Sequence, residues 1–343
     1  MLYPARLFAA ATALVALAMP LIGTPAPAHA EAAEVRFARN LGLGYLPLYI
    51  MEARKLVEKH AAAAGLGEVK ATYLVVGSPG AVNDTLLSGN ADYGIAGIHG
   101  MIIAWDKTRT GAGIRGLAAL SATTLQLNTN NPNIHKLEDF GPNDRIALPT
   151  VGVSSQAYVL QRAAEKIYGS ADLRHFDTIT VSLSHPNGLA ALLAGKTEVT
   201  GHFTTPPYNS LELADPKIHK VTTEAELLGY RSTTMGIWTT QAFYQANPKL
   251  NRAVLAAIDE AVDYIRDNPK EAAAAFIWIE GSSPTLTKEV VEKILASGDV
   301  EYSAVPKGVA DWGQFMQRTG AIKNRPDSWT DLFFDAIHQR PGS

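Results

Sequence analysis

The amino-acid sequence predicts an α/β protein built from two similar lobes. Short apolar runs alternate with helical patterns, which is typical of crossover units around a largely parallel sheet. Residues 86–92 (LLSGNAD) resemble residues 192–198 (LLAGKTE), 106 positions further along the chain, which indicates an internal repeat. The length of 343 residues fits about two domains of ordinary size.

The composition excludes several classes of protein. Hydrophobic residues make up 47% and charged residues 18% of the chain, which is typical of a globular protein with a core. The 30 basic and 33 acidic residues nearly balance, so the chain lacks the basic excess that nucleic-acid binding requires. The chain contains no cysteine, which excludes disulfides, thiolate metal ligands and cysteine nucleophiles.

The first thirty residues resemble a secretory signal peptide. Arg6 is their only charge, an apolar run covers residues 7–18, and Ala28-His29-Ala30 forms a small-residue cleavage site. The alternative is a transmembrane anchor, but the run is short for a hydrocarbon core of about 30 Å and is followed by prolines. We therefore expect residues 1–30 to be removed and the mature protein to be periplasmic.

Each copy of the repeat predicts its own set of strands and helices. In the first copy we expect strands at residues 35–38, 71–76 and 93–98, and helices at 48–64 and 81–88. The second copy predicts strands at residues 145–148, 178–183 and 199–203, and helices at 154–168 and 187–194. In both copies a helix ends in glycine before an acidic residue and a strand, and Ser78 pairs with Ser184.

Two threonine-rich segments, residues 117–129 and 232–240, favour extended structure and are predicted to cross between the lobes. Residues 31–122 and 241–343 would then form lobe 1, and residues 123–240 lobe 2. The last hundred residues are predicted to be helical. Asn247-Pro248 and Asn268-Pro269 predict capped helix starts, the second with Glu271 completing a capping box, and further helices are expected near residues 288–296, 307–319 and 328–338.

The sequence carries no local catalytic signature. It lacks the G-x-S-x-G, H-E-x-x-H and phosphate-loop patterns, and Gly42-x-Gly44 lacks the third glycine of a dinucleotide fingerprint. The histidines stand singly, without the i, i+4 pairs of a helical metal site. We therefore expect no catalytic residue, no metal and no cofactor.

Candidate ligand-binding residues lie in the loops that follow predicted strands. In open α/β sheets ligands bind beyond the carboxyl ends of the strands, where glycine lets a ligand approach backbone N–H groups. Several of these loops lead into helix starts, which favour anions. The candidates are Gly44, Tyr45, Ser78, Ile98, His99, Ser154, Ser155, His202 and Phe203, with Thr124 and Gln126 on the first crossing.

Each candidate also has a structural interpretation. Tyr45 could pack over the following helix, Ser78 could close a turn, and Ser154 could cap a helix. His99 and His202 could be hydrogen-bonded histidines at strand ends. Because five strand ends are expected to converge on one face, the set predicts a site for a small acidic or polar molecule.

These residues resemble a known family, the extracytoplasmic substrate-binding proteins of ABC importers in the nitrate, sulfonate and taurine group, with their thiamine-precursor-binding relatives. The matching motifs are Gly44-Tyr45-Leu46-Pro47-Leu48-Tyr49, residues 86–94, Lys136-Leu137-Glu138-Asp139-Phe140 and the Ser154-Ser155 helix start. Their order and spacing follow the family from about residue 34 to residue 339.

The resemblance implies a two-lobed periplasmic-binding-protein fold of type II, with two hinge crossings and a ligand in the cleft. It implies ligand contacts at Tyr45, Ser78, His99, Thr124, Ser154, Ser155 and His202. The implied partners are a small-molecule ligand and ABC permease subunits at the inner membrane, and the protein is expected to be a monomer that binds no nucleic acid. The strand-end loops contain no arginine, so a ligand held by a bidentate arginine is not expected.

Two alternatives stay open at this point. One is an enzyme related to the pyrimidine synthase of thiamine biosynthesis, although that enzyme uses a cysteine-rich iron motif and this chain has no cysteine. The other is a ligand-sensing subunit that presents its closed form to a receptor.

Overall fold

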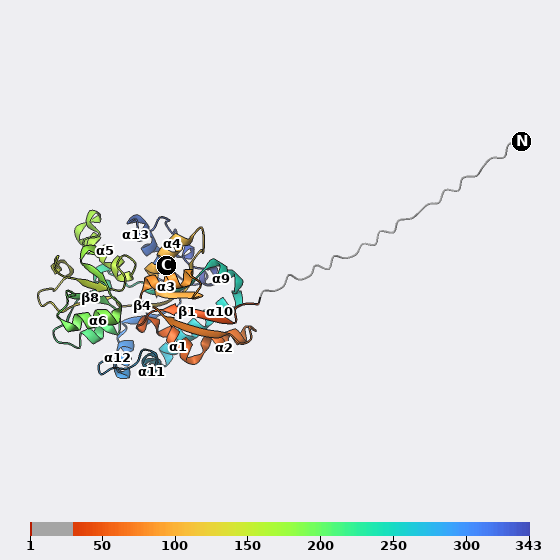
Figure 1. Ribbon diagram of the computed structural model, residues 1–343, viewed down its shortest axis with the longest axis horizontal. Helices are drawn as coiled ribbons and strands as arrows, with labels where there is room; N and C mark the ends of the chain where they lie inside the picture. Colours follow the sequence, from red (N-terminus) through yellow and green to blue (C-terminus); the bar gives the residue numbers. More distant parts are fainter. Residues whose placement is uncertain (2–29) are drawn as a thin grey trace. The chain divides into compact units, whose positions relative to one another are not determined.

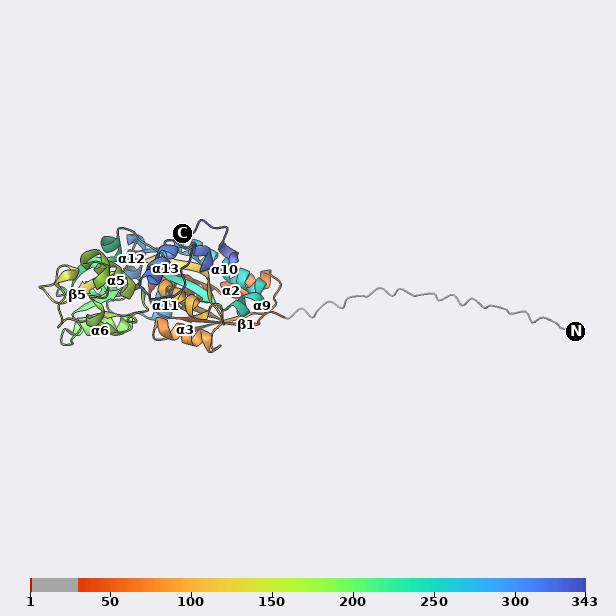
Figure 2. The same ribbon diagram turned by 90° about the horizontal axis from the view of Figure 1, so that it is seen from above.

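The computed structural model describes residue 1 and residues 30–343. The predicted signal peptide therefore lies outside the described residues, apart from its two ends. The described chain contains two sheets, one of six strands in the order β11-β4-β10-β3-β1-β2 and one of five strands in the order β7-β6-β8-β5-β9. Figures 1 and 2 show the elements of the five-stranded sheet, with α5 and α6, beside those of the six-stranded sheet.

The six-stranded sheet combines parallel and antiparallel pairs. β1 pairs in parallel with β2 and β3, whereas β10 runs antiparallel between β3 and β4, and β11 lies antiparallel on the edge of β4. The bounds are β1(Glu34–Arg39), β2(Lys70–Val75), β3(Tyr93–Gly97), β4(Arg115–Thr123), β10(Met235–Thr239) and β11(Val300–Tyr302).

The five-stranded sheet repeats this arrangement. β6 pairs in parallel with β7 and β8, and β5 runs antiparallel between β8 and β9. The order β7-β6-β8-β5-β9 therefore corresponds, strand for strand, to β2-β1-β3-β10-β4, which confirms the internal repeat. The bounds are β5(Gln126–Thr129), β6(Ile146–Leu148), β7(Thr180–Ser182), β8(Gly201–Thr204) and β9(His219–Thr223).

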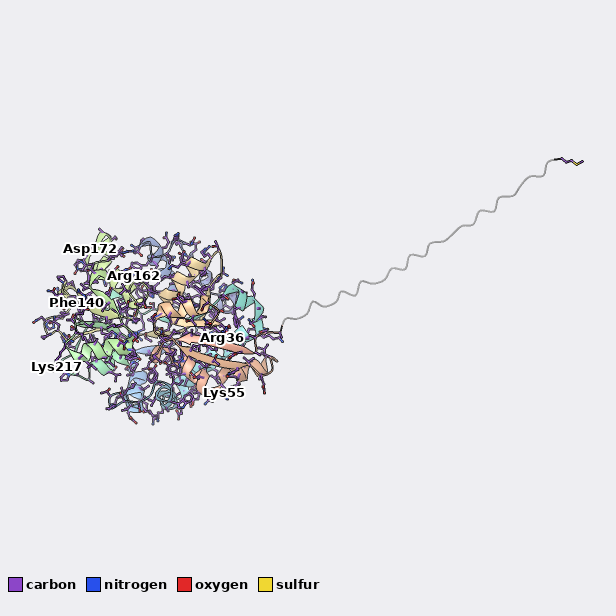
Figure 3. All side chains as sticks on the ribbon, viewed as in Figure 1. Arg36, Lys55, Phe140, Arg162, Asp172 and Lys217 are labelled. Atoms are coloured by element: carbon purple, nitrogen blue, oxygen red, sulfur yellow. The ribbon has the colours of Figure 1, made fainter. Side chains whose placement is uncertain are left out.

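Helices follow the strands of each sheet. Around the six-stranded sheet the chain forms α1(Leu46–Arg54), α2(Leu56–Ala63), α3(Pro79–Leu87) and α4(Ile98–Thr108). Around the five-stranded sheet it forms α5(Ser155–Tyr168), α6(His185–Ala194), α7(Tyr208–Glu212) and α8(Glu224–Leu228). Figure 3 shows Arg36 and Lys55 on the first side and Phe140, Asp172 and Lys217 on the second.

The C-terminal part is helical, as predicted. It comprises α9(Gln241–Ala246), α10(Pro248–Asp267), α11(Pro269–Glu280), α12(Lys288–Ser297) and α13(Val309–Arg318). α10 packs against α1 and α2, so this part returns to the six-stranded sheet.

Short 3₁₀ turns occur along the whole described chain. They lie at η1(Leu43–Tyr45), η2(Leu137–Asp139), η3(Ser170–Asp172), η4(Asp177–Ile179), η5(Trp329–Asp331) and η6(Asp335–Ile337).

Several predicted elements differ from the structure. The helix expected over residues 48–64 is broken at Lys55, whose φ of 51° is left-handed, so α1 and α2 are separate helices. The helix expected over residues 328–338 is replaced by the turns η5 and η6. Asn247 and Asn268 precede their prolines but do not cap with their side chains, because both side-chain amides donate to carbonyls one turn earlier. α4 has no counterpart in the prediction.

Two neighbouring stretches connect the sheets. The chain passes from β4 to β5 at Thr124-Leu125 and returns between Thr223 and Met235. Thr123 and Thr234 join the two stretches, because the Thr123 N–H donates to Thr234 Oγ1 at 2.8 Å and the two hydroxyls lie 3.0 Å apart. Residues 31–343 nonetheless pack as one compact unit, so the exact lobe boundaries stay a prediction.

Candidate functional site

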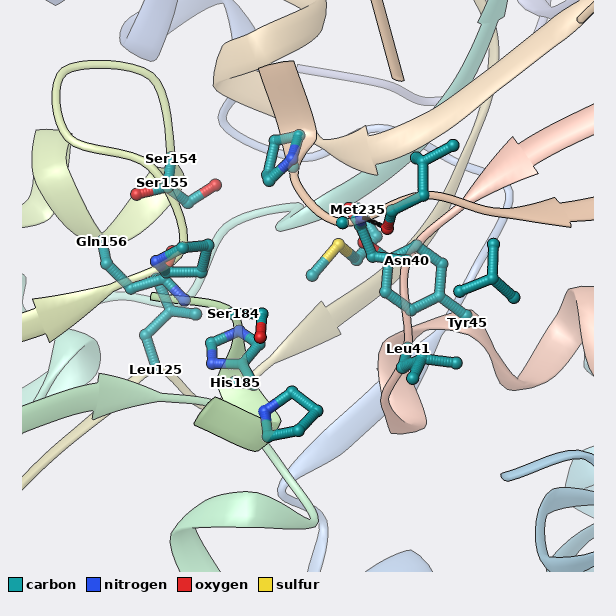
Figure 4. A pocket seen from close by; sticks show the side chains of 17 residues that line it. Asn40, Leu41, Tyr45, Leu125, Ser154, Ser155, Gln156, Ser184, His185 and Met235 are labelled. Atoms are coloured by element: carbon teal, nitrogen blue, oxygen red, sulfur yellow. Dashed lines mark hydrogen bonds between the residues drawn. The ribbon is translucent and has the colours of Figure 1, made fainter. Parts of the chain in front are cut away.

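A cavity of about 320 Å³ lies where strand ends of the two sheets face each other (Figure 4). From the six-stranded sheet its wall comprises Asn40, Leu41, Tyr45, Val75, Val76, Gly77, Pro79, Gly97 and Met235, which we call the first wall. From the crossing and the five-stranded sheet it comprises Leu125, Pro149, Ser154, Ser155, Gln156, Ser184, His185 and Pro186, which we call the second wall.

The cavity is lined mostly by apolar side chains, and none of the described residues that line it is a lysine, arginine, aspartate or glutamate. The starts of α3, α4, α5 and α6 reach it through Pro79, Gly97, Ser155 and His185. The first N–H groups of a helix have no partner within the helix, and their dipole favours negative charge. Pro79 has no N–H, and the Ile98 N–H of α4 donates to the Thr234 carbonyl at 2.9 Å. The starts of α5 and α6 therefore offer the neutral hydrogen-bond donors within an apolar enclosure.

The start of α5 supplies hydroxyl groups. Ser154 is the residue before α5, and its side chain does not cap the helix. Ser154 is only 2% exposed, and its Oγ has no hydrogen-bond partner among the described residues. A buried hydroxyl without a partner is costly, so Ser154 Oγ is available to a ligand in the cavity.

Ser155, the neighbouring hydroxyl, is held by the opposite sheet. Its Oγ lies 2.9 Å from Nδ1 of His99, the second residue of α4. Gly97 makes this approach possible, because a Cβ at position 97 would lie 3.0 Å from the same Oγ. The α4 and α5 starts therefore meet at the cavity without a charged side chain.

His99 lies behind Ser155 and does not line the cavity. Its ring stacks on Tyr158 at 5.2 Å and meets the edge of Trp312 at 4.4 Å. Burial, with a smaller contribution from Arg162, lowers the pKa of His99 to about 3. His99 is therefore neutral, and it positions the Ser155 hydroxyl.

The start of α6 supplies Ser184 and His185. The Ser184 side chain does not cap α6, although Ser184 is the residue before the helix. His185 Nδ1 lies 2.9 Å from the Thr204 hydroxyl, and its ring stacks on Tyr208 at 5.4 Å. Burial, and then the neighbouring His202, lower the pKa of His185 well below its usual value, so this ring is also neutral.

The loop after β1 forms much of the first wall. The Tyr45 hydroxyl donates to Asn40 Oδ1 at 3.3 Å, and the Asn40 amide donates to the Val76 carbonyl at 2.6 Å. Gly44 belongs to this loop, and a Cβ at position 44 would come within 3.0 Å of Met235 and 3.1 Å of Thr123. The glycine therefore lets the loop pack against the crossing.

Charged groups lie behind the loop and not in the cavity. Glu280 accepts hydrogen bonds at 2.5 Å from the Gly42 N–H and from the Tyr49 hydroxyl, and one at 3.4 Å from Tyr208. Burial raises the pKa of Glu280. The Arg39 guanidinium lies 4.4 Å above the Tyr49 ring.

Of the predicted ligand contacts, Tyr45, Ser154 and Ser155 line the cavity. Gly44, Ser78, Ile98 and His99 are neighbours of lining residues but do not line it themselves. Ser78 instead caps α3, because its Oγ accepts from the Ala81 N–H at 3.3 Å, and Ile98 is fully buried as the first residue of α4.

The other predicted contacts lie outside the cavity. The Thr124 hydroxyl is bonded to Arg231 at 3.0 Å and to Asp299 at 3.3 Å, and the Gln126 amide donates to Asn128 at 2.7 Å. His202 and Phe203 are fully buried on β8, with His202 against Glu212 of α7. Neither of these two side chains lines the cavity, and His202 instead packs against Gly188 of α6 and Glu212 of α7. Contact of His202 and Phe203 with a ligand stays a prediction.

Four polar lining residues, Asn40, Gln156, Ser184 and His185, are not among the predicted ligand contacts. A signal for two of them was present, since the repeat pairs Ser184 with Ser78, and the following position is His185. Asn40 and Gln156 each adjoin a selected segment but belong to no motif.

Within residues 30–343, no helix has the length and apolar character that crossing a bilayer requires. The same residues contain no cluster of three or more histidine, aspartate or glutamate side chains arranged to hold a metal ion.

Comparison with known proteins identifies the family and the fold. Residues 68–272, more than half of the chain, match the family model described as NMT1/THI5 like. No curated protein matches the chain by sequence. Together with the solved structures described next, this match confirms the resemblance to binding proteins of the sulfonate and nitrate group.

Solved structures share the fold at low sequence identity. The alkanesulfonate-binding protein SsuA from Xanthomonas axonopodis pv. citri, bound to MOPS, has a TM-score of 0.69 at 18% identity, covering 86% of this chain and 96% of its own. The periplasmic aliphatic sulphonate binding protein SsuA from Escherichia coli has a TM-score of 0.64 at 19% identity, covering 88% and 99%. The periplasmic nitrate-binding protein NrtA from Synechocystis PCC 6803 has a TM-score of 0.59 at 14% identity, covering 77% and 70%. The predicted periplasmic-binding-protein fold is confirmed.

Proposed function

The chain belongs to the NMT1/THI5-like family, and from this premise we propose that it binds a small organic solute in the cavity between its two sheets and delivers it to an ABC importer. The observation that carries the proposal is the unpartnered Ser154 hydroxyl at the start of α5, buried in the wall of the cavity. A solute oxygen at this position would satisfy the hydroxyl and the free N–H groups of the helix start.

The two walls suggest the chemistry of the solute. The second wall presents hydroxyls and a neutral imidazole at Ser154, Ser155, Ser184 and His185, whereas most of the first wall is aliphatic. A solute with an oxygen-bearing head group, such as a carboxylate or sulfonate, and a small apolar body fits this division. Figure 4 shows Ser154, Ser155 and His185 across the cavity from Leu41 and Tyr45.

The affinity that an importer needs is within reach of such contacts. A dissociation constant of about 1 μM corresponds to about −8 kcal/mol. Hydrogen bonds to a charged head group contribute about 1.5–3 kcal/mol each, and burial of the apolar body adds about 25 cal/mol per Å². A few such donors and one apolar wall contribute a gross free energy of this order, from which the cost of immobilising the solute is subtracted.

Binding without chemical conversion is the corresponding proposal for activity. The lining residues include no carboxylate, lysine or cysteine, and the lowered pKa of His185 makes its ring a weak base. The proposed location is the periplasm, and the proposed partners are permease subunits of the importer, with the binding protein as a monomer. Genetic linkage to permease and ATPase genes would support import, whereas linkage to a receptor kinase would support sensing.

The test is a thermal-shift screen of the purified protein against aliphatic and aromatic sulfonates, carboxylates, nitrate and thiamine precursors, followed by calorimetry. A solute that binds the folded state raises the melting temperature by mass action. Ser154→Ala should weaken binding of the best solute about tenfold, whereas the exposed Ser170→Ala should not. Conversion of that solute into a product, or equal affinity in the Ser154 variant, would contradict the proposal.

A further inference from the structure

His185 has one ring nitrogen free for a ligand. Its Nδ1 lies 2.9 Å from Thr204 Oγ1 and 3.4 Å from Nε2 of His202. No described residue makes a hydrogen bond to its Nε2, and the side chain lines the cavity while remaining partly exposed. Whether Nε2 carries a hydrogen therefore decides whether His185 can donate to a ligand or accept from it.

A fully buried pair stands behind His185. His202 and Glu212 are both 0% exposed, and His202 Nδ1 is hydrogen-bonded to Glu212 Oε1. The second oxygen of Glu212 accepts from the Asn128 amide at 2.8 Å. Among the described residues, His202 is the only basic side chain within ion-pair distance of Glu212.

The burial of His202 and Glu212 limits which net charge the pair can carry. A single uncompensated charge in a site without water is much more costly than a neutral group or a matched ion pair. A pair that is neutral overall has one of two forms. Either Glu212 is a carboxylate and His202 an imidazolium, or the proton sits on Glu212 and is donated to His202 Nδ1. In both forms His202 Nε2 carries a hydrogen.

This hydrogen has one ring acceptor nearby, the Nδ1 lone pair of His185. We propose that the buried Glu212–His202 pair fixes the hydrogen of His185 on Nε2, so that His185 offers the cavity a hydrogen-bond donor. The low pKa of His185, caused by burial and then by His202, agrees with a single ring hydrogen. Glu212 and His202 are then positioning residues, which act on a ligand only through His185.

The consequence for the ligand rests on the proposed function. The second wall then presents one donor at the α6 start, His185 Nε2–H, and one at the α5 start, the Ser154 hydroxyl. A ligand that binds both donors needs an acceptor oxygen at each place. Carboxylates, sulfonates and carbonyl compounds satisfy this requirement, whereas an ammonium group placed at His185 leaves two donors facing each other.

The hydrogen can be located without any ligand, by ¹H–¹⁵N correlation spectroscopy of the protein labelled on histidine nitrogens. Signals are assigned with His185→Gln and His202→Gln. We expect His185 to show a single form with the hydrogen on Nε2. A wild-type His185 with its hydrogen on Nδ1 would overturn the inference, while leaving the proposed function untouched because no solute is present.

Two variants test what fixes the hydrogen. In Thr204→Val the other Nδ1 partner is lost, and the Nε2–H form should persist. In the double variant His202→Leu/Glu212→Leu both buried polar partners are replaced, so no unpaired charge remains and the preference for Nε2–H should disappear. Persistence of the single Nε2–H form in the double variant, or its loss in Thr204→Val, would contradict the role of the pair.

Discussion

The starts of α3 and α6 occupy the same place in the two copies of the repeat but treat the cavity differently. α3 begins Ser78-Pro79, and the Ser78 hydroxyl caps its own helix. α6 begins Ser184-His185, and the Ser184 hydroxyl caps nothing. In the first copy the serine hydroxyl is therefore used to cap α3, and the next residue, Pro79, lines the cavity without an N–H group. In the second copy the Ser184 hydroxyl remains free to donate to a ligand. The two copies share the same backbone arrangement, and single side chains make the hydrogen-bonding properties of the two walls different.

The same asymmetry extends into the sheets beneath. At the offset of the repeat, His202 of β8 corresponds to Ala96 of β3, and both are fully buried. The first copy therefore has an apolar residue where the second has a histidine paired with Glu212. Substitutions at corresponding positions of the two copies should show which copy contributes to unfolding free energy and which to ligand affinity.

The largest effect is expected from His202→Ala, which gives the second copy the residue of the first. It leaves Glu212 buried without its partner, and breaking a buried pair in this way costs about 3–5 kcal/mol of unfolding free energy. Urea unfolding measures the loss. The double variant His202→Leu/Glu212→Leu should lose much less, and equal losses in the two proteins would contradict the pairing argument.

The second largest effect is expected in the dependence of the unfolding free energy on pH. The pKa of His99 is lowered to about 3, below the 6.5 of the unfolded chain, so its contribution is complete above pH 6.5 and is lost as the pH falls toward 3. The slope for one proton is about 1.4 kcal/mol per pH unit, which gives about 2 kcal/mol at pH 5. In His99→Gln the decline in unfolding free energy between pH 7 and pH 5 should be shallower by that amount. An unchanged decline would show that His99 protonates as readily in the folded protein.

The two helix starts of the second wall should matter for binding more than for folding. Ser184→Ala should reduce the affinity for the best solute of the screen several-fold, since one donor is lost, and should change the unfolding free energy by less than about 0.5 kcal/mol. Calorimetry and urea unfolding on the same preparation separate the two quantities.

Ser78→Ala should behave in the opposite way. The loss of an N-cap costs about 1 kcal/mol of unfolding free energy, and affinity should be nearly unchanged because the Ser78 hydroxyl is engaged with Ala81. If Ser78→Ala weakened binding as much as Ser184→Ala, the division of labour between the two copies would be wrong.

The sequence predicted the architecture well because the architecture depends on repeated local signals. The strand–helix alternation and the glycine after α3 and α6 recur at a fixed offset, and they lead to two sheets of corresponding order. The break at Lys55 was not predictable, because lysine has no preference for a left-handed conformation and the surrounding pattern is continuous. Residues 328–338 have helical spacing, yet they fold as two short turns.

The site was predictable only where a helix start carries its own signature. Ser154 and Ser155 stand at such a start and line the cavity, as does Tyr45 of the first loop. His202 follows the same strand-end logic but lies beneath α6, where Gly188 leaves room for its ring. Which side of a strand a histidine faces depends on packing between elements distant in sequence. His185 is not predictable from the sequence for the same reason, because the proposed orientation of its ring hydrogen depends on His202, seventeen residues away.

A cavity whose donors carry no full charge has a consequence for the conditions under which the protein can work. Salt weakens attraction between exposed ions, with a screening length of about 8 Å at physiological ionic strength, but it affects enclosed dipoles much less. Retention of a solute by hydroxyls, an imidazole and helix ends should therefore vary little between dilute and saline surroundings. Such tolerance would suit the proposed role of a periplasmic carrier.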